Sequence, residues 1–163
     1  SHDIPNTVER AAAAHARHGV EIMNAHASGG VDMLRAFAAG AAAGAAAIGR
    51  PTPITLGVTV LTSDPDASAF DERLASVATA GLDGVVCSAL EVGRAAAAGL
   101  RTMVPGIRLA GGETHDQARV GTPGATIASG ATWLVIGRAV TAADAPEAAA
   151  ATIAAEVLDA LGA

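Results

Sequence analysis

Five short apolar segments recur along the chain, and each is bounded by turn residues such as Gly, Pro, Asp or Ser. Each segment is too short to be a buried helix, so each is predicted to be a buried strand. Their apolar residues are continuous rather than alternating, which is typical of parallel strands covered on both faces. The predicted strands are residues 20–25, 54–62, 84–87, 102–104 and 133–136.

Segments with helical character separate these strands, namely residues 6–18, 31–48, 69–80, 91–98, 123–129 and 146–161. Strands that alternate with helices imply an α/β fold with right-handed crossovers. Two architectures fit this alternation, an open doubly wound sheet and a (β/α)₈ barrel. No G-x-G-x-x-G motif follows the first predicted strand, which weakens the dinucleotide-binding form of the open sheet.

Polar segments follow the predicted strands directly, as they do at the functional end of a barrel. HASGG follows the first strand, PGIR the fourth and GRAVT the fifth. Five strands cannot close an eight-stranded barrel, however, and would leave open edges. The polar cluster HDIPNT at the start of the sequence is interpreted as the end of a further strand.

The composition excludes several classes of protein. A formal charge of −6 argues against a general nucleic-acid surface. A single cysteine, Cys87, rules out a disulfide framework and a cysteine-based zinc site, and is interpreted as a small buried apolar residue. The apolar stretches are interrupted by Gly, Arg or His, so no membrane span is expected and a soluble cytoplasmic protein is predicted. All ten basic residues are arginines, so the chain offers no lysine for proton donation.

Two polar segments near the N-terminus have both a structural and a functional interpretation. In HDIPNT, Asn6 or Thr7 is expected to cap the following helix, whereas Asp3 precedes a proline and is expected at a strand tip. In HASGG, Ser28 is expected to cap the next helix, and His26 fits a structural and a functional role equally well.

The last two strand–helix units combine a Gly-rich stretch, residues 110–117, with arginines in PGIR and VIGR. A flexible loop after one strand and an arginine after the next are common in barrels that hold a phosphate. This pairing favours a phosphate site over two solvated surface arginines. Thr62 and Ser63, at the end of the second strand, would either cap the next segment or hydrogen-bond a planar polar ring.

Seven segments in this order resemble the orotidine 5′-monophosphate decarboxylase family: HDIPNT, NAHASGG, VTVLTS, LDGVVCSALE, PGIR, DQARVGTP and VIGRAVT. The resemblance covers essentially the whole chain. It implies that residues 1–163 are a single domain, the C-terminal part of a (β/α)₈ TIM barrel, and supply about five strands, four to eight. It also implies a homodimer with active sites at the subunit interface, a nucleotide substrate, and neither cofactor nor metal.

The resemblance also assigns roles to single residues. Asp3 matches the last carboxylate of the family's Asp-x-Lys-x-x-Asp motif and is the predicted catalytic residue. Together with Ile4 and Thr7, it is expected to reach into the partner subunit's site. Thr62 matches a pyrimidine-contacting residue. The remaining matches bind the base edge and the 5′-phosphate: Arg108, Gln117, Gly137 and Arg138.

The implied reaction is decarboxylation of orotidine 5′-monophosphate to uridine 5′-monophosphate, in de novo pyrimidine biosynthesis. The chain departs from the family in three places. The motif's lysine would immediately precede Ser1, so the 163 residues alone are expected to be inactive. The segment from Ser63 to Arg73 is short, and Ala139 replaces a common proline. Two alternatives remain: a sugar-phosphate decarboxylase of the same superfamily, and a non-catalytic phosphate-binding barrel fragment.

Overall fold

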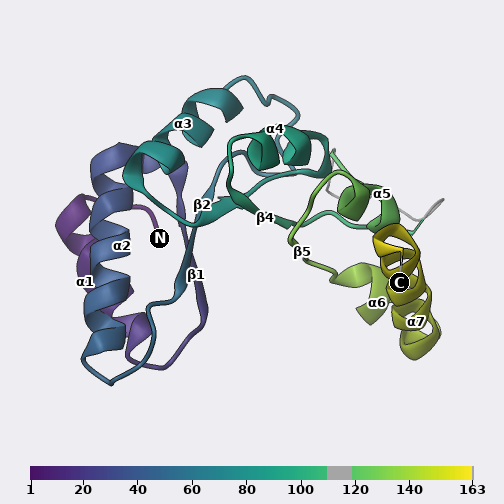
Figure 1. Ribbon diagram of the computed structural model, residues 1–163, viewed down its shortest axis with the longest axis horizontal. Helices are drawn as coiled ribbons and strands as arrows, with labels where there is room; N and C mark the ends of the chain where they lie inside the picture. The colour runs from purple at the N-terminus through teal and green to yellow at the C-terminus, as the bar shows by residue number, and fades with distance from the viewer. Residues whose placement is uncertain (110–118, 163) are drawn as a thin grey trace. The chain divides into compact units, whose positions relative to one another are not determined.

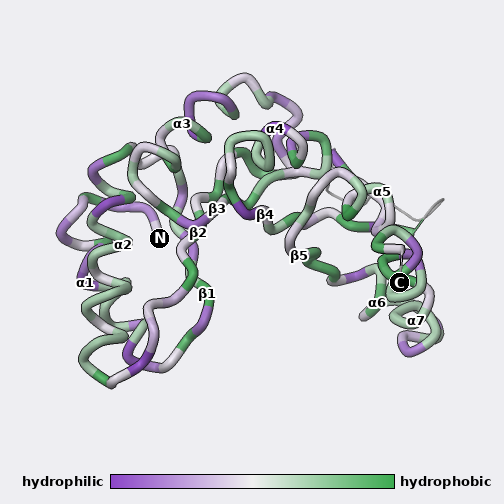
Figure 2. Tube along the Cα trace, viewed as in Figure 1, coloured by the Kyte–Doolittle hydropathy of each residue, from purple (hydrophilic) through white to green (hydrophobic). Residues whose placement is uncertain are grey.

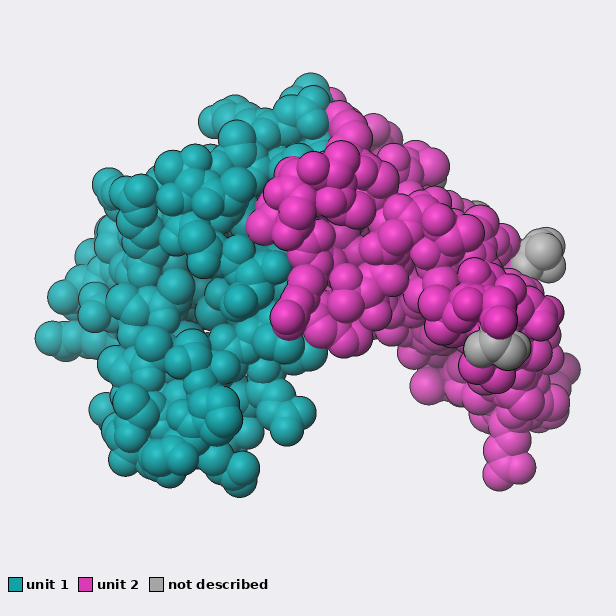
Figure 3. Space-filling view, in the orientation of Figure 1, with its two compact units in different colours: residues 1–59, 68–86 teal, residues 60–67, 87–163 magenta. Residues whose placement is uncertain are grey.

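The computed structural model describes residues 1–109 and 119–162. The chain divides into two compact units, shown in different colours in Figure 3. Unit 1 comprises Ser1–Thr59 and Ser68–Val86, and unit 2 comprises Val60–Ala67 and Cys87–Ala163. The polypeptide therefore passes from unit 1 into unit 2 directly after Thr59, within the segment that the sequence predicts to be the second strand.

Unit 1 is a three-stranded parallel sheet with three α-helices (Figure 1). Strand β2 pairs with β1 on one side and with β3 on the other. The register aligns Ile22 with Ile54 and Leu56 with Gly84. The elements are α1 (Pro5–Ala16), β1 (Ile22–His26), the 3₁₀ turn η1 (Ala27–Gly29), α2 (Gly30–Ala46), β2 (Ile54–Val58), α3 (Phe70–Ala80) and β3 (Gly84–Val86).

Unit 2 contains two parallel strands and four α-helices among its described residues (Figure 1). Met103 of β4 aligns with Trp133 of β5. Helix α7 packs against both α5 and α6. The elements are the 3₁₀ turn η2 (Ala89–Glu91), α4 (Val92–Ala97), β4 (Arg101–Val104), α5 (Pro123–Ala128), β5 (Trp133–Leu134), α6 (Arg138–Thr141) and α7 (Pro146–Leu161).

The predicted alternation of parallel strands and helices is confirmed. The largest difference in a strand is at β2, which ends at Val58 rather than Thr62. Beyond it, the carbonyl groups of Val60 and Leu61 accept hydrogen bonds from an arginine side chain instead of a neighbouring strand. Helix α6 was not predicted, because four residues are too few to show a helical period.

Helices α1 and α2 lie side by side in unit 1 (Figure 1) and make the most extensive contact between any two elements. Gly40 and Gly44 of α2 face the backbone of Glu9 and Ala13 in α1 so closely that an added Cβ would overlap it. Glycine at these positions lets the helix backbones approach each other. Figure 2 shows α2 largely in the green of apolar residues, as expected for a helix that buries Phe37.

Across the part of the chain that the structure describes, no helix is both long enough and apolar enough to cross a membrane.

Candidate functional site

The chain segment after β2 is held by hydrogen bonds where it begins, at Thr59. In unit 1, the backbone N–H of Thr59 donates to the Val86 carbonyl at 3.0 Å, and its hydroxyl donates to the same oxygen at 2.9 Å. Arg73 of α3 donates to the Thr59 carbonyl at 2.7 Å. In unit 2, the half-buried Thr62 lies in the turn that follows. Thr62, the predicted pyrimidine contact, thus follows an anchored residue by three positions.

Unit 2 buries a carboxylate at the start of η2. Ser88 and Glu91 form a capping box, in which the Ser88 N–H and hydroxyl donate to Glu91 Oε2 at 2.9 and 2.8 Å. Glu91 Oε1 pairs with the guanidinium of Arg119. Only 2% of Glu91 and 7% of Arg119 is exposed, so this is a buried ion pair. Burial raises the pKa of the neighbouring Cys87 thiol to about 12, and the charge of Glu91 adds to that effect.

The PGIR segment, residues 105–108, packs against Gly121. Ile107 forms an isolated parallel bridge with Gly121, and the Arg108 N–H donates to the Gly121 carbonyl at 3.0 Å. The turn requires a residue in the left-handed backbone conformation, and Gly106 adopts it with φ of +79°. A Cβ at Gly121 would overlap the side chain of Ala89 in η2, so glycine lets the backbone at residue 121 approach that side chain closely.

Arg108 is a buried cation in this turn. Its guanidinium Nη1 donates to the Ile107 carbonyl at 2.7 Å, and 7% of the residue is exposed. Its burial contradicts a solvated surface arginine, one of the two interpretations that the sequence left open.

Gly137 and Arg138 follow β5. Gly137 is the N-cap of α6, and its carbonyl accepts hydrogen bonds from the N–H groups of Val140 and Thr141 at 2.9 and 3.0 Å. A Cβ built at Gly137 meets no atom within 4 Å, so the backbone there is open to a ligand. Arg138 is exposed, in contrast to Arg108. An exposed arginine beside open backbone is suited to bind a phosphate that arrives from solvent.

Unit 1 holds the other predicted site residues near its N-terminus. Asp3, Ile4 and Thr7 are all exposed. The Asp3 carboxylate accepts a hydrogen bond from the Ile4 N–H at 2.7 Å. An open hollow of about 650 Å³ adjoins this segment, and its lining residues are His2, Asp3, Ile4, Pro5, Ser28 and Gly29.

Two predicted helix caps are wrong. Helix α1 begins at Pro5 with Ile4 as its N-cap, so neither Asn6 nor Thr7 caps it. Proline fixes φ near its helical value, which lets the helix begin one residue earlier than the polar side chains suggest. Ser28 lies within η1 and does not cap α2; its hydroxyl is 3.5 Å from His2 Nδ1 instead.

His26, at the end of β1, stacks on His2 with ring centroids 6.2 Å apart. Burial lowers the pKa of His26, and the positive charges of the N-terminal amine, His2 and Arg73 lower it further. The structure thus favours a neutral imidazole at this strand end.

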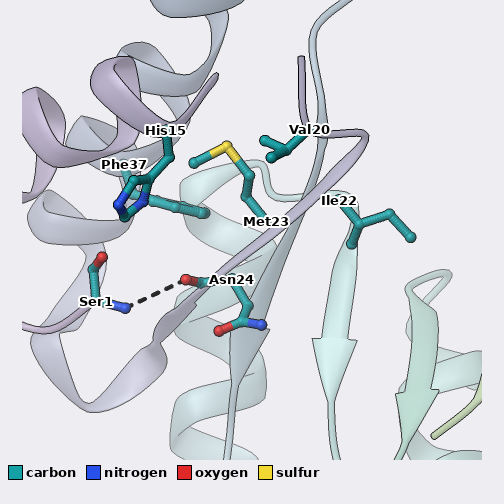
Figure 4. A pocket seen from close by; sticks show the side chains of 7 residues that line it. All are labelled: Ser1, His15, Val20, Ile22, Met23, Asn24 and Phe37. Carbon is teal, nitrogen blue, oxygen red and sulfur yellow. Dashed lines mark hydrogen bonds between the residues drawn. The ribbon is translucent and has the colours of Figure 1, made fainter. Parts of the chain in front are cut away.

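A separate cavity of about 200 Å³ lies beside β1 in unit 1 (Figure 4). The Ser1 amine donates to the Asn24 carbonyl at 3.4 Å, and the His26 N–H donates to the Ser1 carbonyl at 3.0 Å. These are the two hydrogen bonds that a parallel strand residue makes with its neighbour, so Ser1 pairs with the edge of β1. None of the predicted substrate residues lines this cavity.

The two units thus divide the predicted site residues. Thr62, Arg108, Gly137 and Arg138 belong to unit 2, whereas Asp3, Ile4 and Thr7 belong to unit 1. Gln117 lies outside the described residues. Sequence reasoning missed Glu91 and Arg119, although the Ser-x-x-Glu spacing of a capping box was readable in CSALE.

Comparison with known proteins shows close relatives along nearly the whole chain. Residues 1–153 match the family described as orotidine 5′-phosphate decarboxylase / HUMPS. Orotidine 5′-phosphate decarboxylase of Halorhodospira halophila is 50% identical, over 96% of this chain and 70% of that protein. The enzyme of the same name from Moorella thermoacetica is 46% identical, over 96% of this chain and 68% of that protein.

A solved structure shows the same fold. The crystal structure of orotidine 5′-phosphate decarboxylase from Lactobacillus acidophilus has 34% sequence identity and a TM-score of 0.76, over 96% of this chain and 71% of that one. This likeness confirms the predicted α/β barrel fold, of which the chain matches the larger part. Because both sequence and fold agree along the chain, it belongs to the orotidine 5′-phosphate decarboxylase / HUMPS family.

Proposed function

We propose that this protein decarboxylates orotidine 5′-monophosphate to uridine 5′-monophosphate, a step of pyrimidine biosynthesis. The observation that carries the proposal is 50% identity to a relative of that name across nearly the whole chain. The side chains of unit 2 support it. A half-buried hydroxyl at Thr62, a buried guanidinium at Arg108 and an exposed one at Arg138 suit a planar base that carries a phosphate.

The chemistry explains why charged groups of both signs are required beside C6 of the base. Loss of CO₂ from C6 leaves a carbanion in the plane of the ring, where the ring's π system cannot stabilise it. A nearby ammonium stabilises that charge and then protonates it, while an adjacent carboxylate crowds the substrate's own carboxylate. Asp3 is the proposed carboxylate. Residues 1–163 contain no lysine, so the ammonium group has to come from outside them.

Arg138, with Gln117, is the proposed ligand of the 5′-phosphate. A guanidinium binds two phosphate oxygens at once, and the open backbone at Gly137 leaves room for the anion. The phosphate is distant from C6, so its binding energy accelerates the reaction only if it helps to hold the base against the groups that act on it.

We also propose a homodimer with shared sites. Asp3, Ile4 and Thr7 are exposed on unit 1 and border an open hollow rather than a closed pocket. An exposed carboxylate in an open hollow needs a second surface to complete a water-excluding site. In this arrangement, Asp3, Ile4 and Thr7 of one subunit reach into the active site of its partner.

Turnover of two substrates tests the proposed reaction. The full-length protein that contains this chain is expected to consume orotidine 5′-monophosphate, with loss of orotate absorbance and release of CO₂. A sugar phosphate with a carboxylate β to a carbonyl serves as the comparison, and no turnover of it is expected. Turnover of the sugar phosphate alone would establish the alternative activity. A purified chain of these 163 residues is expected to consume neither substrate.

A further inference from the structure

Arg119 ties together three segments of unit 2, each of which follows a different strand. Its Nη1 pairs with Glu91, which follows β3. Its Nη2 donates to the carbonyl groups of Val60 at 3.3 Å and Leu61 at 3.0 Å, which follow β2. Arg119 itself follows β4. We call Arg119, Glu91, Ser88 and the two carbonyl groups the Arg119 clamp.

The clamp is costly to bury, so its presence requires an explanation. Removal of two charges from water is repaid only when geometry and hydrogen bonding are good, and well-packed apolar residues often replace such a pair without loss of stability. In the clamp, both Glu91 oxygens and both terminal nitrogens of Arg119 are used. Apolar residues would fill the same space but would leave the carbonyl groups of Val60 and Leu61 without these donors.

The position of the clamp in the chain shows what it holds. Leu61 directly precedes Thr62, the proposed pyrimidine contact, and Arg119 comes two residues after Gln117, a proposed phosphate ligand. The carbonyl groups of two successive residues, bonded to one rigid guanidinium, fix the path of the backbone into Thr62. A small displacement of such a segment is costly, because substrate contacts depend on placement within about 1 Å.

We propose that Arg119 and Glu91 are positioning residues, which hold the segment of Thr62 in the register that binds the nucleotide base. This inference rests on the proposed function and extends it to two residues that touch no substrate atom. Arg119 acts through the Val60–Leu61 backbone, and Glu91 acts through Arg119, whose guanidinium it fixes.

The test separates positioning from stability with a double variant of the full-length protein. Arg119→Met alone leaves the buried Glu91 carboxylate without its positively charged partner, and is expected to lower the melting temperature sharply. Glu91→Gln with Arg119→Met removes both charges, keeps an acceptor for Ser88, and is expected to restore a melting temperature close to the parent's. Arg94→Met, which removes an exposed arginine of α4, is the matched control.

In the folded double variant, the KM for orotidine 5′-monophosphate is expected to rise about 10- to 100-fold, with kcat within about threefold of the parent. The control is expected to keep the parental KM. A merely structural ion pair predicts that recovered stability brings back the parental KM. A parental KM in the folded double variant would therefore overturn the proposal.

Hydrogen exchange gives a second readout that needs no activity. The amides of residues 60–63 are expected to exchange faster in the double variant, while those of β1 and β2 stay protected. If the parent consumes no orotidine 5′-monophosphate, the proposed function fails, and exchange alone decides the clamp. Unchanged exchange at residues 60–63 would then overturn it.

Discussion

The two units, coloured separately in Figure 3, differ in the side chains that they bury. Among the described residues, the buried polar groups of unit 1 are the threonines Thr55 and Thr59. Its interior is otherwise apolar and includes Phe37 and Phe70. Unit 2 contains every charged side chain that is buried in the described part of the chain: Glu91, Arg108 and Arg119.

The difference concerns the interiors of the two units, since the predicted site residues Asp3, Ile4 and Thr7 lie on the surface of unit 1. An apolar interior is the least costly way to hold a fold together, whereas buried charges oppose folding unless each is paired. The proposed positioning role of Arg119 and Glu91 offers a reason for unit 2 to keep such charges. In unit 2, the buried charges adjoin the segments that carry Thr62 and Arg108. Substitutions in the apolar interior of unit 1 should consequently affect stability, whereas substitutions at the proposed substrate contacts should affect activity.

The largest effect is expected at Arg138, an exposed arginine of unit 2. A guanidinium–phosphate pair in a partly dehydrated site contributes on the order of 2–5 kcal/mol when one partner is truncated. Arg138→Ala in the full-length enzyme should therefore lower kcat/KM for the nucleotide roughly 30- to several-thousand-fold. Steady-state kinetics with low substrate concentrations would measure this change.

The nucleoside without the phosphate is the control for Arg138. Its turnover is expected to change hardly at all in Arg138→Ala, since the contact that the substitution removes is absent. Equal loss with both substrates, in a folded protein, would show that Arg138 acts on the base or on the chemistry and not on the phosphate.

A subunit-mixing experiment tests whether the units cooperate within a subunit or between subunits. If Asp3 of unit 1 works in the partner's site, a heterodimer of Asp3→Ala with Arg138→Ala has one intact site and one with both lesions. Random assortment of equal amounts makes about half of the dimers mixed, so activity should recover to about a quarter of the parental value. Native mass spectrometry would verify subunit exchange.

If both residues act in their own subunit's site, every site of the mixed dimer keeps a lesion. Activity after mixing would then stay at the mean of the two single variants. That outcome, with exchange demonstrated, would reject the shared site while leaving the Arg138 assignment intact.

A smaller effect, on stability alone, is expected in unit 1. Gly40→Ala adds a methyl group where α2 meets the Glu9 backbone of α1, so the helices have to separate. The free energy of unfolding should fall by about 1–3 kcal/mol, measured by urea denaturation. The KM of the remaining folded enzyme should be parental, because Gly40 belongs to the scaffold.

Gly93→Ala in α4 of unit 2 is the matched control, since an added Cβ there meets no atom within 4 Å. Alanine is the better helix former, so this variant should be more stable by up to about 1 kcal/mol. If Gly40→Ala stabilises the protein in the same way, the close approach of α1 and α2 is not what constrains that position.

Local patterns in the sequence predicted the elements well where strong end signals exist. Helix α7 spans Pro146–Leu161, the same bounds that the sequence indicates, because Pro146 sets its first turn and Gly162 ends it with φ of +71°. Strand bounds are less accurate: β5 ends at Leu134, two residues before the end of the apolar run. An apolar run therefore does not by itself fix where a strand ends: Val135, directly after β5, is apolar and yet exposed.

The candidate site was predictable only where a residue follows a strand or resembles a family motif. Thr62, Arg108 and Arg138 were found this way, and their substrate roles stay predictions until tested. The capping predictions for Thr7 and Ser28 failed, since a helix start depends on backbone geometry as well as on a nearby hydroxyl. Arg119 carried no local signal, because its partner Glu91 lies 28 residues away.

By itself, the sequence determined the alternation of strands and helices, their parallel pairing, the family and the absence of lysine. The strands and helices follow from residue type and spacing over a few neighbouring residues or one helical turn. The family follows from the order of short motifs along the chain. Tertiary structure alone decided which charges are buried and what they hold. Burial and ion pairing depend on distances between segments far apart in the chain, and only folding brings Val60, Glu91 and Arg119 together.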